Sequence, residues 1–270
     1  MTKKILACVL VLALLFGLTG HASEDVPTGP LRIKRWDEKT LREKYPTVMV
    51  KGAEYFATAG KMLGEDSIGE KLTSVMVVGN DVYTSRSYSI KCDVYAIKTV
   101  SSKYVAAVKF EGFKGYYPYS NMWYTPETLG DFIDDLNLKE NLIINNKFYY
   151  EYWDGGAPGK GNYIMTEYSL PDPSVIWELL LSDRTAKNMG PEYYGGKTLM
   201  GNSVSVKITG EKNITLSVNE AGYLYTNILG TGKAFYIGKK KANDFARYVK
   251  RNGIEKILKP GAATPMPLKS

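Results

Sequence analysis

The stretch KCDVYAIKTV, residues 91–100, alternates in residue type with a period of two. In an extended chain, one side carries Cys92, Val94 and Ala96, and the other side carries Tyr95, Ile97 and Thr99. Such alternation is typical of an antiparallel strand whose sheet packs one face on a hydrophobic core. The stretch therefore predicts a sheet, and the sequence on either side indicates how far that sheet extends.

Runs of the same texture lie before and after this stretch. They are rich in Val, Tyr, Phe and Thr, and residues that favour turns cluster between them, which is the pattern of short antiparallel strands. The runs are TVMVKGAEYFATA (47–59), KLTSVMVVG (71–79), KYVAAVKFEG (103–112) and KGYYPYSNMWY (114–124).

The period changes to that of a helix at TPETLGDFIDDLNL, residues 125–138. Apolar residues recur there at helical spacing: Leu129, Phe132, Ile133 and Leu136. Thr125 is the expected N-cap and Pro126 suits the first turn. We expect this helix to close a first unit.

A second unit repeats the plan. Its expected strands are two short ones around Asn145-Asn146, one at NYIMTEYSL (162–170), and a meander through SVSVKITG, KNITLSVNE, GYLYTNIL and GKAFYIG between 203 and 238. A helix should open at Asp172 and end near Asp183. A basic helix from Lys239 to Arg251 should follow, with Gly253 at its end and four residues inward: Ala242, Phe245, Ala246 and Val249.

These patterns predict an α+β fold, made of two units of short antiparallel strands, each with helices packed on the sheet. The expected segments are a signal peptide at 1–22, a flexible leader at 23–46 with one short helix over Asp37–Tyr45, a first unit at 47–140, a second unit at 141–255 and a disordered tail at 256–270.

Residues 1–22 have the layout of a secretory signal peptide: a short cationic start, an apolar stretch, and the triplet Gly20-His21-Ala22. We expect cleavage after Ala22 and a soluble, secreted product, with an uncleaved membrane anchor as the alternative. Cys8 is not expected to be a lipoprotein site, because the apolar run follows it. Cleavage would remove two lysines and lower the formal net charge from +7 to +5.

The expected mature chain contains no histidine, because His21 is the only one in the sequence. This excludes catalytic triads and the usual zinc sites, which need imidazole as a base or ligand. Cys92 would be the only cysteine left, and we expect it to be a buried small residue. No phosphate-binding loop is found, and no dense Lys/Arg patch with interleaved aromatics that would suggest nucleic acid, so we expect no cofactor, metal, nucleotide or nucleic acid.

Two further interpretations remain open. Paired carboxylates hydrolyse glycosides without histidine, and the candidates are Asp131, Asp134, Asp135, Glu151 and Asp154. Tyrosine is abundant, and amphipathic aromatic side chains stack on sugars or anchor protein partners. The candidate binding residues are Tyr116, Tyr117, Tyr119, Trp123, Tyr150, Tyr152 and Trp153.

Four segments carry a family resemblance: DSIGEKLTSV (66–75), CDVYAIKTVSSKYVAAVKFEGFKGYY (92–117), VIWELLLSDRTAKN (175–188) and GYLYTNILGTGKAFYIGKKK (222–241). Together they resemble the extracytoplasmic region of clostridial-type transmembrane signal transducers related to beta-lactam-sensing zinc metallopeptidases. The resemblance implies a sensor-like or accessory domain outside a Gram-positive cell. It carries over no catalytic residue, because the HExxH motif and the membrane helices of that family are absent.

We therefore expect a secreted, non-enzymatic binding or sensor-type protein of the cell envelope. Its partner is expected to be an envelope component, a peptide or a membrane receptor. The alternatives are a carboxylate-based glycoside hydrolase and a secreted inhibitor or structural surface protein.

Overall fold

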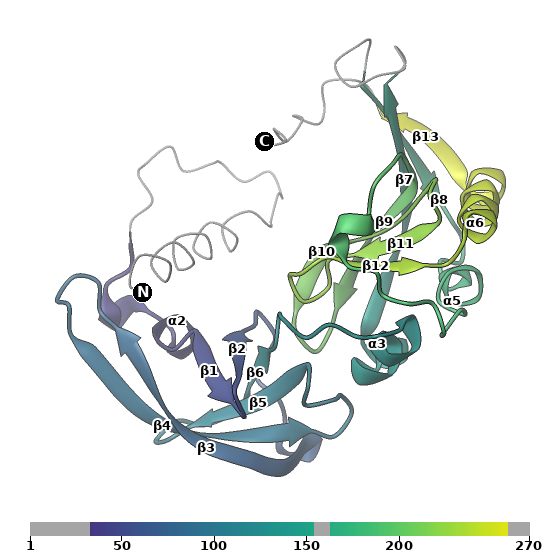
Figure 1. The fold of residues 1–270 in the computed structure, drawn as a ribbon. Helices are drawn as coiled ribbons and strands as arrows, with labels where there is room; N and C mark the ends of the chain where they lie inside the picture. The colour runs from purple at the N-terminus through teal and green to yellow at the C-terminus, as the bar shows by residue number, and fades with distance from the viewer. Residues whose placement is uncertain (1–32, 154–162, 259–270) are drawn as a thin grey trace. The chain divides into compact units, whose positions relative to one another are not determined.

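A computed structural model of the protein describes residues 33–153 and 163–258. The chain divides into two units, Met1–Glu38 and Lys39–Ser270. The described part of the first unit holds one 3-10 turn, η1 (Trp36–Glu38). The second unit holds thirteen strands within the described residues, in two antiparallel sheets (Figure 1).

The first sheet has the strand order β1-β2-β6-β5-β4-β3. Its strands are β1 (Thr47–Val50), β2 (Ala53–Ala57), β3 (Ile68–Asn80), β4 (Ser87–Ile97), β5 (Val105–Phe110) and β6 (Tyr117–Ser120). The second sheet has the order β12-β11-β10-β9-β7-β8-β13. Its strands are β7 (Leu142–Trp153), β8 (Tyr163–Ser169), β9 (Thr198–Val206), β10 (Glu211–Asn219), β11 (Tyr223–Thr226), β12 (Lys233–Tyr236) and β13 (Ile254–Leu258).

Most helices of the second unit are short. The α-helices are α2 (Leu41–Lys44), α3 (Leu129–Asp135), α4 (Leu138–Asn141), α5 (Val175–Leu179) and α6 (Lys239–Asn252). The 3-10 turns are η2 (Glu65–Ser67) and η3 (Pro191–Tyr193). Only α6 is longer than two turns, and strands make up most of the regular secondary structure of the described residues.

The six-stranded sheet curls until its two edge strands, β1 and β3, contact each other, which gives a nearly closed barrel. Its interior is lined by Val48, Val50, Val77, Cys92, Val94, Val108, Phe110 and Tyr119, all buried. The Tyr119 hydroxyl donates a hydrogen bond of 2.6 Å to the backbone oxygen of Tyr45. Cys92 is therefore a buried small residue, as predicted, and burial raises the pKa of its thiol to about 11.

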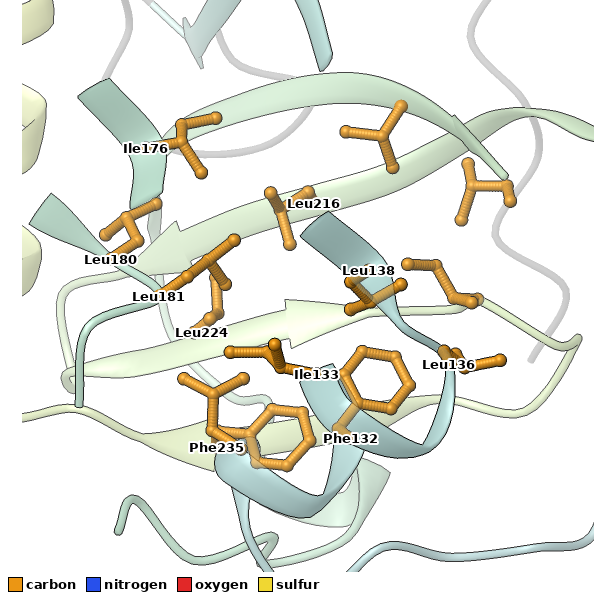
Figure 2. Close-up of a cluster of buried hydrophobic side chains, with 14 of the residues drawn as sticks. Phe132, Ile133, Leu136, Leu138, Ile176, Leu180, Leu181, Leu216, Leu224 and Phe235 are labelled. Carbon is orange, nitrogen blue, oxygen red and sulfur yellow. The ribbon is translucent and has the colours of Figure 1, made fainter. Parts of the chain in front are cut away.

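A second core lies between the helices and the seven-stranded sheet (Figure 2). Phe132 of α3 packs against Phe235 of β12, with 5.5 Å between ring centroids. Leu216 and Leu224 contribute from β10 and β11, and Ile176 contributes from α5. Val105 and other residues of β4 and β5 belong to the same cluster. Strand β5 is thus buried on both faces, by the barrel interior on one side and by this core on the other.

The predicted α+β class is wrong, because the protein is mostly β and helices are not packed on both sheets. The six-stranded sheet covers its inner face by closing on itself, so it needs no helix there. The helix expected to close the first unit, α3, packs instead into the core of the seven-stranded sheet. The strands are also longer than expected, with 13 residues in β3 and 12 in β7.

Local details correct other expectations. The two short strands predicted around Asn145-Asn146 are one strand, β7, with a register shift between Ile144 and Phe148. The side-chain amide of Asn202 holds this bulge, because its nitrogen donates to the backbone oxygens of Asn145 and Lys147, each at 2.7 Å. This irregularity absorbs two extra residues of β7 without ending the strand.

The sequence predicts the bounds of α6 correctly and those of the shorter helices wrongly. The N-cap of α3 is Thr128, three residues after the expected Thr125. Helix α5 begins at Val175 after Ser174, and the helix expected over Asp37–Tyr45 is replaced by η1 and the single turn α2. The prediction for α6 is confirmed, because it ends at Gly253 and buries the four expected residues Ala242, Phe245, Ala246 and Val249.

Several predictions lie outside the described residues. These are the signal peptide at 1–22, the leader up to residue 32, the carboxylate candidate Asp154, and the tail from residue 259. The first three residues of the expected tail, 256–258, belong instead to strand β13, which pairs with β8. In the ranges that are described, no helix is long and apolar enough to cross a membrane.

Candidate binding surface

The aromatic residues chosen from the sequence fall in separate places. Tyr119 is buried inside the barrel, and the Tyr117 ring lies 5.9 Å from that of Phe110. Tyr116 packs edge-on against Tyr95 at 5.4 Å. Trp123 is 62% exposed in the loop after β6. The structure does not gather these residues into one surface.

Two of the chosen residues do lie together on β7. The rings of Tyr150 and Tyr152 stack at 5.5 Å between centroids. The ammonium group of Lys250 lies 3.6 Å from the centroid of the Tyr150 ring, and that of Lys197 lies 5.5 Å from it. A hydrogen bond with Tyr150 raises the pKa of Lys197. The position of Trp153 along β7 is described, and its side chain is not.

A different group of residues forms a continuous row across the whole seven-stranded sheet. The register of the strand pairs aligns Lys256, Glu167, Tyr149, Gly201, Ser217, Tyr225 and Ala234, from β13 to β12. Because side chains alternate along a strand, these residues share one face. Their sequence neighbours, among them Phe148 and Leu216, point to the helix-covered core. The row therefore lies on the face opposite the core.

The segment that contains η3 adds a second tyrosine layer to this row. The Tyr194 ring stacks on that of Tyr225 at 4.2 Å between centroids. Its hydroxyl shares hydrogen bonds with Ser217 (2.7 Å) and Thr198 (3.1 Å). The Asn219 amide fixes the segment by donating to the backbone oxygen of Gly195. Burial, followed by the neighbouring Tyr194, raises the pKa of Tyr225.

Three more tyrosines continue the row at the β12 edge. The Tyr223 ring lies 5.2 Å from that of Tyr236 and 6.3 Å from that of Tyr193. An open depression of about 370 Å³ adjoins them and is lined by Tyr223, Tyr236, Asp183, Thr185, Ala186, Lys187 and Met189. We call the set Tyr149, Tyr193, Tyr194, Tyr223, Tyr225 and Tyr236 the tyrosine face.

Small residues separate the aromatic groups of the tyrosine face. Tyr149 on β7 and Tyr225 on β11 are three strand spacings apart, which is roughly 14 Å. Gly201 and Ser217 lie between them in the row. A Cβ atom at Gly201 would meet its nearest neighbours at 3.7 and 3.9 Å, which is ordinary contact. The partly exposed Gly201 therefore lies between Tyr149 on one side and the stacked rings of Tyr225 and Tyr194 on the other.

The row contains two charged residues, the buried Glu167 and the exposed Lys256. Glu167 is buried and its carboxylate lies 3.2 Å from the ammonium group of Lys147. Burial raises the pKa of the Tyr149 hydroxyl, and the negative charge of Glu167 adds to this shift. At the other end, the depression is lined by one acid, Asp183, and one base, Lys187. The tyrosine face thus offers aromatic rings and hydroxyl groups with little net charge.

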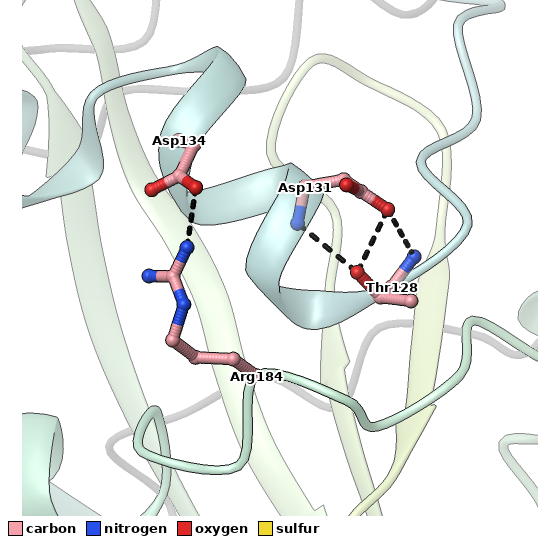
Figure 3. Close-up of polar contacts among 4 residues, drawn as sticks. All are labelled: Thr128, Asp131, Asp134 and Arg184. Atoms are coloured by element: carbon pink, nitrogen blue, oxygen red, sulfur yellow. Dashed lines mark hydrogen bonds and ion pairs between the residues drawn. The ribbon is translucent and has the colours of Figure 1, made fainter.

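Four of the five carboxylates considered for glycoside hydrolysis have structural partners, two of which are drawn in Figure 3, and Asp154 lies outside the described residues. Asp131 forms a capping box with Thr128 at the start of α3, and Asp134 forms an ion pair with Arg184. Asp135 accepts a hydrogen bond of 2.9 Å from the Tyr124 hydroxyl. Glu151 is hydrogen-bonded to Tyr163, where burial and this bond raise the tyrosine pKa. These contacts give each of the four carboxylates a structural role, so no catalytic role is needed to account for them.

One buried lysine has a perturbed pKa. Lys233 is 1% exposed, and burial lowers the pKa of its ammonium group to about 8 despite the opposing charge of Glu211. The ammonium donates to the backbone oxygens of Ile228 and Thr231, each at 2.8 Å. These bonds fasten the loop between β11 and β12. Because the lysine is enclosed, we assign it a structural role.

The sequence analysis missed the tyrosine face. A signal existed, because Tyr223 and Tyr225 are two residues apart in GYLYTNIL and must share a strand face. Tyr149 joins them only through strand pairing, and Tyr194 only through a loop. Within the described ranges, no cluster of three or more metal-binding side chains is found. Comparisons of this chain with protein-family models, with curated proteins and with solved structures find no match, so the tyrosine face is interpreted from its own geometry.

Proposed function

We propose that the protein is a secreted, non-catalytic binding protein of the cell envelope, with a sensor-type or accessory role, and that it binds a neutral oligosaccharide on the tyrosine face. The observation that carries this proposal is the row Tyr149, Gly201, Ser217 and Tyr225 across β7, β9, β10 and β11. It places aromatic rings on both sides of the partly exposed Gly201, while the buried Ser217 holds the Tyr194 hydroxyl in place.

The chemistry of the row favours a sugar. Tyrosine presents a flat apolar ring and a hydroxyl group, which suits the apolar face and the hydroxyl rim of a pyranose. Ser217 and Thr198 already orient the Tyr194 hydroxyl, so this ring is held in place before a ligand arrives. The compensated charges of Glu167 with Lys147 favour a neutral ligand over a charged one.

The test is isothermal titration calorimetry of the protein with neutral oligosaccharides, acidic oligosaccharides and peptides. We expect the neutral sugars to bind and to be recovered unchanged. Tyr149→Ala and Tyr225→Ala should each weaken binding about tenfold. Gly201→Leu should abolish binding with the fold intact. The Cβ atom of the new side chain fits at this position, and the rest of the side chain would cover the surface between Tyr149 and Tyr225.

Tyr248→Ala is the matched control, because Tyr248 is 38% exposed on α6, away from the tyrosine face. The proposal is overturned if none of the sugars binds, or if the control weakens binding as much as Tyr225→Ala does. Cleavage of the sugar would contradict the non-catalytic role. Secretion has a separate test, since N-terminal sequencing of the exported protein should begin at Ser23, and a start at Met1 would contradict cleavage.

A further inference from the structure

Helix α6 concentrates positive charge. It carries six basic residues and one acid, Asp244, and so has a net charge of +5 within a chain whose total is +7. The basic residues are Lys239, Lys240, Lys241, Arg247, Lys250 and Arg251. The other charges of the chain nearly cancel, so α6 dominates the charge asymmetry of the described protein.

The outer side of α6 carries a line of cations with one acid, Asp244, between them. Its apolar side is buried against the seven-stranded sheet (Figure 1). Lys240, Arg247 and Arg251 are spaced by seven and four residues, so they fall on one line along the opposite side. We call these three residues the α6 ridge. Lys240 and Arg247 have side chains 92% and 75% exposed.

Helix stability does not account for all of this charge. Basic residues at the C-terminal end of a helix interact favourably with its dipole, which explains Lys250 and Arg251. Three lysines at the N-terminal end, with no acid in the first turn, have the opposite effect. Asp244 pairs with Lys240 at 2.6 Å and with Arg247 at 3.3 Å, and it is the only acid in α6.

The cations also continue beyond the ridge. Lys250 lies on the side of α6 that approaches β7, with its ammonium 3.6 Å from the centroid of the Tyr150 ring. Lys197, before β9, approaches the same ring. The positive surface therefore extends around α6, from the α6 ridge to the side of the helix that approaches β7.

We propose that the α6 ridge is a docking surface for a linear polyanion, such as a polymer that carries phosphate groups. Charge complementarity identifies this occupant, because the cations of α6, from Lys239 to Arg251, extend along about 18 Å. A flexible chain follows charges that wrap around a helix, whereas a flat membrane touches only the outermost line. Stable membrane binding by an amphipathic helix also needs a free apolar side, and that of α6 is buried.

The test uses the full chain and fluorescence-labelled, long-chain inorganic polyphosphate, with binding measured by anisotropy at several salt concentrations. The ridge variant is Lys240→Gln/Arg247→Gln/Arg251→Gln. The control variant is Arg86→Gln/Lys91→Gln/Lys114→Gln, which removes the same charge from exposed positions outside α6. We expect the ridge variant to bind about 100-fold more weakly with a smaller salt dependence, and the control to change binding by less than about threefold.

A second variant tests the same surface in the opposite direction. Asp244→Asn removes the acid that competes for Lys240 and Arg247, so it should tighten binding. Equal weakening by the ridge and control variants would overturn the proposal, because net charge alone would then explain binding. Binding to phosphatidylglycerol vesicles without binding to polyphosphate would also overturn it, in favour of a membrane. Neutral-sugar binding on the tyrosine face is independent of both outcomes.

Discussion

The two sheets differ in what covers their faces. The six-stranded sheet closes on itself, and its central strand β5 is buried on both faces. The seven-stranded sheet buries one face under helices and leaves the row of Tyr149, Gly201, Ser217 and Tyr225 on the other. The interior of the nearly closed sheet is filled by its own side chains, whereas the second sheet has a face that the helices do not cover and on which strand alternation can build a binding surface.

We expect the largest difference in unfolding free energy between substitutions on the two faces of β12. Phe235 and Tyr236 are neighbours that point to opposite faces, one buried in the core and one 48% exposed. Phe235→Ala should lower the free energy of unfolding by about 3 to 5 kcal/mol, because it leaves a cavity. Tyr236→Ala should change it by less than about 1 kcal/mol. Urea denaturation measures both, and equal losses would mean that the outer face is also part of the core.

Lys233 should make the seven-stranded sheet more stable at alkaline pH. Below pH 8 the lysine is protonated in both states, so the cost of burying its charge is present in full. Above pH 8 the folded lysine loses its proton while the unfolded one, with a pKa near 10.5, keeps it, and the cost is relieved. The unfolding free energy should therefore rise with pH.

The rise attributable to Lys233 is about 2 kcal/mol between pH 8 and pH 10, given folded and unfolded pKa values of about 8 and 10.5. It is measured as the difference between the wild type and Lys233→Met in urea denaturation across this range. Subtraction removes the shared contribution of the buried tyrosines. A difference that stays constant or falls would show that the lysine is not buried as a cation.

The start of α3 tests a smaller, local difference. Thr128 forms the capping box with Asp131, whereas Thr125 makes only an exposed contact with the backbone oxygen of Trp123. Thr128→Ala should cost about 1 kcal/mol of stability, and Thr125→Ala less than about 0.5 kcal/mol. The reverse order in thermal or urea unfolding would place the helix start where the sequence alone predicts it.

The smallest effects compare two buried tyrosines in the two cores. Tyr119 in the barrel donates to the backbone oxygen of Tyr45, while the Tyr104 hydroxyl has no hydrogen-bond partner among the described residues. Tyr119→Phe should lower stability by about 1 kcal/mol, and Tyr104→Phe should leave it unchanged or raise it by up to about 1 kcal/mol. A loss in both variants would indicate that Tyr104 has a partner after all, such as a buried water.

Much of the local structure could be predicted from the sequence. The alternation in residues 91–100 located β4, and helical spacing located α6 with its buried residues. The α3 cap was misplaced because Thr125 and Thr128 both precede the apolar run, and only the packed chain selects between them. The sequence predicts a break between two strands at the bulge in β7. The side-chain amide of Asn202, which supports the bulge, is distant in sequence and so gives no local signal.

Periodicity in the sequence predicts most of the strands and the long helix, because it is a property of neighbouring residues. The sequence also shows that the only histidine, His21, lies within the first 22 residues. The folded chain is needed to show that β1 meets β3, that Tyr119 is buried, and that Tyr149 and Tyr225 share the face opposite the helices. Alternation tells which side chains share a face, but what covers that face depends on contacts between segments far apart in the chain.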